Sequence, residues 1–197
     1  MSQNVYPPTV PLAVANSVTV DEAKSDLWKR LVPSLGQHFF VVNNMDRESG
    51  FINVSYSGDP IKYVDCGHLK VNDNEFPGAQ AYTQYNVFLV VENFKVQRRM
   101  ALEGRANIVL EELEPKKTKV SAHTRYVITR SVTATNSRGQ SRAESSTVAF
   151  NTGTDGTFEG QYAVTCRATG LFEADILKLV QSPSPPKQSE VVSGKQD

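Results

Sequence analysis

Few residues in this 197-residue chain could carry covalent or metal chemistry, since it has three histidines and two cysteines. His38, His68 and His123 share no motif with one another or with a cysteine. Cys66 and Cys166 lie far apart and lack the CxxC or Cys–His spacing of a zinc site. The sequence therefore predicts no metal site, and we interpret the histidines as ordinary surface or boundary residues.

Motifs for catalysis and cofactor binding are missing as well. The sequence has no GxSxG serine motif, and its glycines follow neither Walker-type nor dinucleotide-binding spacing. Carboxylates cluster at Asp46 and Glu48, and again at Glu111, Glu112 and Glu114, but both clusters fall at predicted hairpin ends where solvent surrounds them. We expect a protein that is not an enzyme and that uses no cofactor.

Charge and hydropathy exclude two further classes. Lysine plus arginine and aspartate plus glutamate each number 21, so the formal net charge is zero. A nucleic-acid-binding protein would show a basic excess or stripe, and we interpret Arg98 and Arg99 as a solvated strand end rather than part of a phosphate track. No apolar run approaches the ~20 residues of a transmembrane helix.

The elements that would position any site are organised around a long hairpin between Met100 and Thr135. Apolar residues alternate with polar ones along both arms, and Glu114–Lys117 supplies the reversal. Such a period of two predicts a sheet with one apolar, buried face and one solvated face. The expected buried residues are Met100, Leu102, Gly104, Ala106, Ile108, Leu110, Val120, Ala122, Thr124, Tyr126, Ile128, Val132 and Ala134.

An amphipathic helix is predicted on each side of the predicted strands. The first begins near Val20 with a capping box at Thr19 and Glu22, and the second begins after Thr169. Their apolar stripes contain Ala23, Leu27, Leu31 and Leu35 in the first and Phe172, Ile176, Leu179 and Val180 in the second. The predicted fold class is therefore α+β, an antiparallel sheet of about six to seven strands with the N-terminal and C-terminal helices packed on one face.

Composition divides the chain into three parts. Residues 1–18 contain Pro7, Pro8 and Pro11 and predict a flexible tether, 19–181 form a single α+β domain, and 182–197 are a polar, proline-containing tail expected to be disordered. Within the domain, a polar segment from Asn72 to Gln84 predicts a surface loop that either contacts a partner or is a mobile connection. Its candidate contact residues are Asn72, Asp73, Asn74, Glu75, Phe76 and Pro77.

The cysteines and the N-terminus leave the compartment open between two alternatives. Met1 to Asn4 lack the basic start and apolar core of an export signal, so either the protein is cytosolic or a signal has been removed from its precursor. In the cytosol, Cys66 and Cys166 would be two unrelated thiols. In an oxidising compartment they would form a disulfide, closing a loop of about 100 residues that contributes about 4 to 5 kcal/mol in the chain-entropy model.

Two segments carry a family resemblance. The first runs from Leu27 to Tyr56 and includes Phe39–Val42 and the Asp46–Gly50 turn, and the second runs from Cys166 to Leu177. Both are similar to segments of Gram-negative outer-membrane lipoproteins, including those with BamC-like helix-grip domains, over about a third of the chain. The resemblance implies a helix-grip-like fold, an export signal and lipid anchor upstream of residue 1, and residence in the outer membrane or periplasm. It also favours the Cys66–Cys166 disulfide.

These observations lead to two functional hypotheses. The first is a non-catalytic lipoprotein domain of the bacterial cell envelope that acts as a scaffold or adaptor for another envelope protein, with no role for nucleic acid. The alternative is a binding module that holds a small apolar ligand in a cavity between the helices and the sheet.

Overall fold

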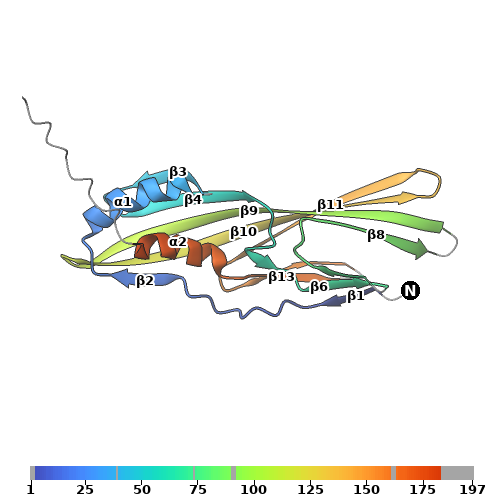
Figure 1. Cartoon of the computed structure of the whole chain (residues 1–197), viewed down its shortest axis with the longest axis horizontal. Helices are drawn as coiled ribbons and strands as arrows, with labels where there is room; N and C mark the ends of the chain where they lie inside the picture. Colours follow the sequence, from blue (N-terminus) through green and yellow to red (C-terminus); the bar gives the residue numbers. More distant parts are fainter. Residues whose placement is uncertain (1–2, 39, 73, 90–91, 161–162, 183–197) are drawn as a thin grey trace, which may run out of the picture.

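A computed structural model describes residues 3–38, 40–72, 74–89, 92–160 and 163–182 of the chain. The molecule is elongated, with both helices at one end and the tips of several long strands at the other (Figure 1). Thirteen strands and two helices occur among these residues. The predicted disordered tail, apart from Ser182, lies outside them.

One very long hairpin runs through the molecule. It consists of β9 (Glu92–Glu114) and β10 (Lys117–Asn136), which pair antiparallel over their whole length. Alternation is confirmed as far as Ile128, because Leu102, Ile108, Val120 and Ile128 have no solvent-exposed surface. From residue 129 to the end of β10 every residue is half-buried, so the prediction that Val132 and Ala134 are buried was wrong. We call the side formed by the even-numbered residues of β9 and β10 the dry face, and the other side the wet face. β9 begins at Glu92, so the hairpin is longer than the sequence predicted from Met100.

Different strands flank the hairpin at its two ends. Near the Glu114–Lys117 turn the neighbours are β2 (Ser17–Val20) beside β10, and β4 (Phe51–Gly58) followed by β3 (Val41–Asp46) beside β9. Toward the opposite end they are β8 (Tyr82–Leu89) beside β9 and β11 (Ser141–Asn151) beside β10. These seven strands form one antiparallel sheet.

Two smaller antiparallel sheets correct the predicted layout of a single sheet. One contains β1 (Gln3–Tyr6), β6 (His68–Val71) and β7 (Asn74–Pro77), and the other contains β5 (Val64–Asp65), β12 (Asp155–Phe158) and β13 (Val164–Ala168). β5 and β6 are separate strands because Gly67 lies between them, and its φ of 67° is a left-handed conformation that a regular strand cannot contain.

Helix α1 (Lys24–Gln37) packs its predicted stripe onto the dry face. Leu27, Leu31 and Leu35 are fully buried, and the helix continues through Pro33. It begins later than the capping box predicted, and Ala23 at its N-terminus makes no side-chain capping bond. The reason is long-range: Thr19 belongs to β2 and pairs with β10, so it is unavailable as a helix cap.

Helix α2 (Leu171–Gln181) lies beside α1 on the same face (Figure 1). Its Phe172 is fully buried and its ring centroid is 5.0 Å from that of Tyr63 and 5.2 Å from that of Phe40. Gly104 makes room for this ring, since a Cβ there would lie 2.6 Å from its Cε2 atom. Arg30 of α1 donates a hydrogen bond to the Leu179 carbonyl at 3.0 Å, which satisfies a free carbonyl at the end of α2.

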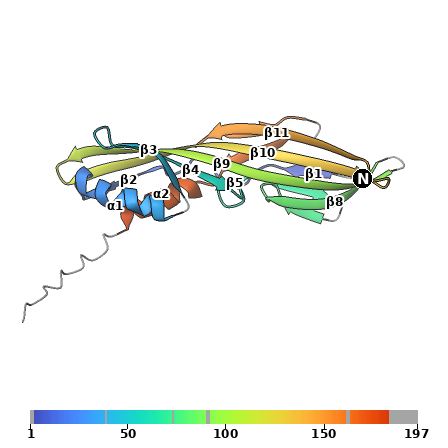
Figure 2. The same ribbon diagram turned by 90° about the horizontal axis from the view of Figure 1, so that it is seen from above.

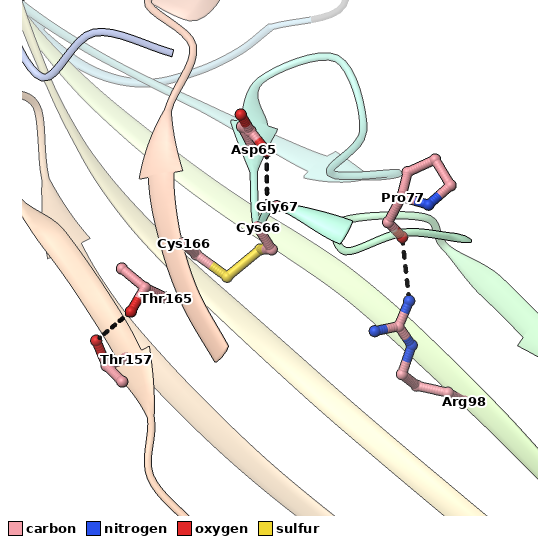
Figure 3. The surroundings of a disulfide bond; sticks show 8 residues. All are labelled: Asp65, Cys66, Gly67, Pro77, Arg98, Thr157, Thr165 and Cys166. Atoms are coloured by element: carbon pink, nitrogen blue, oxygen red, sulfur yellow. Dashed lines mark hydrogen bonds between the residues drawn. A yellow bond between two sulfur atoms is a disulfide. The ribbon is translucent and has the colours of Figure 1, made fainter. Parts of the chain in front are cut away.

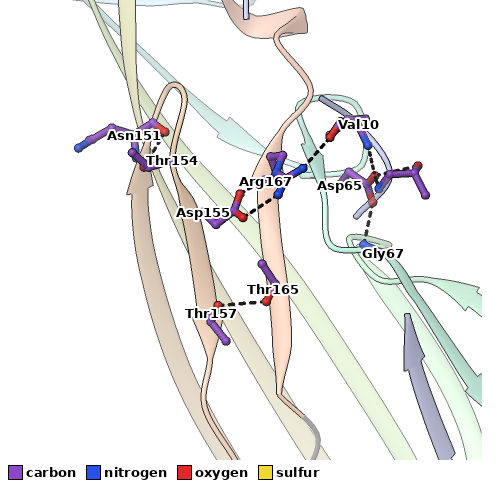
Figure 4. Close-up of polar contacts among 10 residues, drawn as sticks. Val10, Asp65, Gly67, Asn151, Thr154, Asp155, Thr157, Thr165 and Arg167 are labelled. Atoms are coloured by element: carbon purple, nitrogen blue, oxygen red, sulfur yellow. Dashed lines mark hydrogen bonds and ion pairs between the residues drawn. The ribbon is translucent and has the colours of Figure 1, made fainter. Parts of the chain in front are cut away.

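The N-terminal segment is part of the folded body, in contrast to the flexible tether predicted for residues 1–18. β1 pairs with β6, and β2 pairs with β10. Between them, the Asp65 carboxylate accepts hydrogen bonds from the backbone N–H groups of Thr9 and Val10, and Arg167 donates to the Val10 carbonyl while pairing with Asp155 at 2.7 Å (Figure 4). Sequence composition missed this because the segment docks by backbone pairing rather than by a buried stripe of its own.

Candidate functional site

The dry face runs along β9 and β10, the two longest strands of the main sheet, and the segments that cover it change along its length. Figure 2 shows the helices at one end and β8 and β11 reaching toward the other. We call these the helical end and the distal end. At the helical end α1 and α2 cover the face, and around its middle β7 and the β12–β13 hairpin lie over it, as contacts of Pro77 and Phe158 with the hairpin show.

The helical end contains one buried polar cluster. The Tyr126 hydroxyl donates to the Glu173 carboxylate, with oxygen–oxygen distances of 3.0 and 2.9 Å, and the Thr152 hydroxyl lies 2.6 Å from the same carboxylate. Glu173 is fully buried in the first turn of α2, where the helix dipole favours a negative charge. Burial, followed by the nearby Glu173 charge, raises the pKa of Tyr126, so the phenol remains a donor.

This cluster holds α2 in position on the sheet. Its members form hydrogen bonds with one another. The ring of Phe150 stacks on Tyr126 at a centroid distance of 5.3 Å, and the ring of Phe172 meets Tyr126 edge-to-face at 6.0 Å. A buried carboxylate with hydroxyl donors makes docking specific, because any shift of the helix would leave a charge without its donors.

At the distal end the dry face is open. Val87 of β8 pairs with Phe94 of β9, and on the next register level Val96 pairs with Ala134 of β10. Together they line an open groove of about 430 Å³ whose rim is polar and includes Arg142. Val87, Phe94 and Ala134 are only half-buried, whereas Val96 is nearly covered.

The cover reaches only the near edge of this groove, at the register level of Val96. The Phe76 ring of β7 lies 5.9 Å from the ring of Tyr85, which pairs with Val96. Beyond Tyr85 the apolar side chains of the sheet face solvent in the part of the chain that the structure describes. The distal groove is therefore a continuation of the core surface that the fold leaves uncovered.

Two arginines interrupt the dry face between its covered and open parts. Arg98 and Arg130 have even numbers on β9 and β10, and Arg98 is only 4% exposed. We interpreted Arg98 as a solvated strand end, and that prediction was wrong. The alternation itself could have predicted this burial, because Arg98 and Arg130 are even-numbered like Met100 and Ile128 and therefore lie on the same face.

The structure brings together the two cysteines for which the sequence left a disulfide open. Cys66 and Cys166 form a disulfide with a sulfur–sulfur distance of 2.02 Å and a sequence separation of 100 residues (Figure 3). Both are buried, and the bond joins the segment between β5 and β6 to β13, and so links the two small sheets. It indicates an oxidising, non-cytoplasmic compartment.

The predicted contact loop is a strand for most of its length. Asn74 to Pro77 form β7 and pair with β6, while Asn72 has the positive φ of 55° that its tight reversal requires. Asp73 lies outside the described residues. Backbone pairing and the contact of Phe76 with Tyr85 hold this segment against the sheet, so its residues do not form a free loop.

Residues with metal or catalytic potential stay dispersed. Within the described ranges, no three His, Cys, Asp or Glu side chains gather as a metal site would require. His123 faces Asn16 on the wet side, and His38 contacts the Ser34 carbonyl near the end of α1. None of the described helices has the length and hydropathy to cross a bilayer.

Comparisons with known proteins gave no match to a protein family, to a curated sequence or to a solved structure. The residues that the structure describes form a mostly antiparallel β protein with two helices and one disulfide. Its distinguishing surface is the dry face of the β9–β10 hairpin, which extends into the distal groove beyond the segments that cover it.

Proposed function

We propose that this protein is a non-catalytic scaffold or adaptor of the bacterial cell envelope that binds another envelope protein through its distal groove. The observation that carries the proposal is the half-buried row Val87, Phe94 and Ala134, which continues the buried face of the same hairpin. Apolar surface next to a polar rim is the usual composition of a protein–protein contact.

The shape of the molecule supports this assignment. The groove is far from the packed helices, and it lies on paired strands of a sheet rather than on a loop (Figure 1). A rigid platform loses little conformational entropy when a partner binds to it. The oxidising compartment indicated by the disulfide agrees with an envelope location, and a lipid anchor upstream of residue 1 would hold the domain at the membrane.

The alternative, a small apolar ligand between helices and sheet, has less support. Leu31, Phe172 and Ile176 fill that interface and have no exposed surface. A pocket of about 220 Å³ lies at its rim against Lys24 and Trp28. A cavity between the helices and the sheet would require Leu31, Phe172 and Ile176 to move apart.

A site-specific crosslinking experiment tests the adaptor proposal. A photoreactive amino acid replaces Phe94 in the groove, and in a matched variant it replaces Val109, an exposed apolar residue on the wet face of the same strand. We expect a defined crosslink to one envelope protein from position 94 and none from position 109. Equal crosslinking from both positions, or none from position 94, would contradict the proposal.

A further inference from the structure

The pocket around Arg98 and Arg130 adjoins the distal groove but shares none of its lining residues, and it has a different chemistry. It has a volume of about 290 Å³ and is formed where β9, β10 and β11 face the two small sheets. Its apolar walls include Val5, Leu69 and Val132. Two guanidinium groups enter this apolar space, which is costly unless an anion or several acceptors compensate.

Arg98 is the more deeply placed of the two. Its Nε donates to the Thr83 hydroxyl at 3.1 Å. Its Nη2 donates to the Pro77 carbonyl at 3.2 Å (Figure 3). A guanidinium has five N–H donors, so most of them have no acceptor among the described residues. No described carboxylate lies within ion-pair distance of Arg98, although it is only 4% exposed.

Arg130 lies on the neighbouring strand and is half-buried. Its guanidinium carbon is 4.5 Å from the centre of the Phe158 ring, and its Nε donates to the Ser146 hydroxyl at 3.3 Å. Burial lowers the pKa of both arginines, and the charge of Arg130 lowers that of Arg98 further. Two like charges in one apolar pocket are the arrangement that an incoming anion stabilises.

Acidic residues occur only at the rim of the pocket. Glu144 pairs in register with Val132, and Glu159 follows β12, and both are exposed. Glu144 acts on Arg130 through space, but neither carboxylate forms an ion pair with a described arginine. The deep part of the pocket is thus cationic, while the formal charges of the whole lining cancel.

We infer that this pocket binds the carboxylate of a small organic acid with a short apolar chain. Arg98 holds the carboxylate through its free N–H groups, Arg130 adds a second positive charge, and the chain lies against Val5, Leu69 and Val132. The rim carboxylates oppose multiply charged anions such as phosphate, which favours a single negative charge. This inference does not depend on the adaptor function.

Hexanoate is a suitable probe, titrated into the ¹⁵N-labelled full chain and followed by NMR at the arginine Nε–H signals. We expect saturable shifts at Arg98 and Arg130 and none at Arg99, which lies on the wet face over the Tyr82 ring. Hexanol, which has the chain without the charge, should bind at least about tenfold more weakly, because charge-assisted hydrogen bonds are lost. Inorganic phosphate should also bind more weakly than hexanoate.

Variants separate binding from folding. Arg130→Gln should weaken hexanoate about tenfold while the urea midpoint stays close to wild type, and Arg99→Gln, the matched control, should change neither. Arg98→Lys keeps the charge but loses the planar fork and should weaken binding as well. The inference is overturned if hexanoate leaves both signals unmoved, if hexanol binds equally well, if phosphate binds more tightly, or if Arg130→Gln retains full affinity.

Discussion

The two ends of the β9–β10 hairpin have the same alternating pattern but different surroundings. At the helical end, Ile108 and Tyr126 are fully buried, and the ring of Tyr126 lies 6.0 Å from that of Phe172 in α2. At the distal end, Phe94 and Ala134 occupy the same face and remain half-exposed. The difference shows that an apolar face serves either as half of a core or as a binding surface, depending on whether other segments reach it.

The cover is also held differently at the two ends. Helix α2 is fixed by the buried Tyr126–Glu173 cluster and by aromatic packing, whereas β7 reaches the distal half through backbone pairing and the contact of Phe76 with Tyr85. A single disulfide joins the small sheets that lie between these regions. Mutations should therefore have large effects at the helical end and small effects on stability at the distal end.

The largest effect is expected from Leu31→Asp. Leu31 is fully buried between α1 and the sheet, so the variant places an unpaired charge in the core. We expect a loss of about 4 kcal/mol or more in the free energy of unfolding, measured by urea denaturation. Lys29→Ala on the exposed side of the same helix is the control and should change stability by less than about 0.5 kcal/mol. A mild effect of Leu31→Asp would show that the helical end is not a packed core.

The Cys66→Ala/Cys166→Ala double variant should have the next largest effect. The bond closes a 100-residue separation, and removing it increases the entropy of the unfolded chain. We expect a loss of about 4 kcal/mol in urea denaturation without reductant, at the lower end of the chain-entropy value for this loop. Wild-type protein with reductant should unfold at the same urea concentration as the double variant. A loss below about 1 kcal/mol would show that the small sheets are held in place without the bond.

Tyr126→Phe tests the polar cluster through its pH dependence. Since the folded pKa of Tyr126 is raised, the phenol stays protonated in the folded protein while an unfolded tyrosine ionises above about pH 10. Wild-type stability should then fall with pH above about 10, by up to about 1.4 kcal/mol per pH unit from this group. Tyr126→Phe should show a shallower fall in that range and run parallel to wild type between about pH 7 and 9. Identical slopes above about pH 10 would contradict a buried, protonated phenol.

Features with a local or periodic signal could be predicted from the sequence. Alternation identified Ile108, Tyr126 and Ile128 as buried, and spacing at steps of four identified the stripes of both helices. The disulfide was favoured by the resemblance and is present. An antiparallel sheet with two helices is confirmed, while the number of sheets was wrong.

Features that depend on distant pairing could not be predicted in the same way. Thr19 and Glu22 have the spacing of a capping box, but the backbone of Thr19 pairs with β10. Residues 3–6 form a strand because β6 offers an edge for pairing. Arg98 was assigned to solvent by residue type, although its position in the alternation placed it inside. The open distal groove has no sequence signal, because alternation shows which side is apolar and says nothing about what covers it.

The smallest effect on stability is expected at the distal end, from Phe94→Asp. Because Phe94 is already half-exposed and has no cover beyond Tyr85, the change should alter the free energy of unfolding by less than about 0.5 kcal/mol, measured by urea denaturation. The same variant should abolish crosslinking to the envelope partner when the photoreactive residue is placed at position 134 in the same groove. Val109→Asp on the wet face is the matched control and should keep the crosslink. A loss above about 2 kcal/mol would mean that Phe94 belongs to a core, and the contrast between the two ends of the hairpin would then fail.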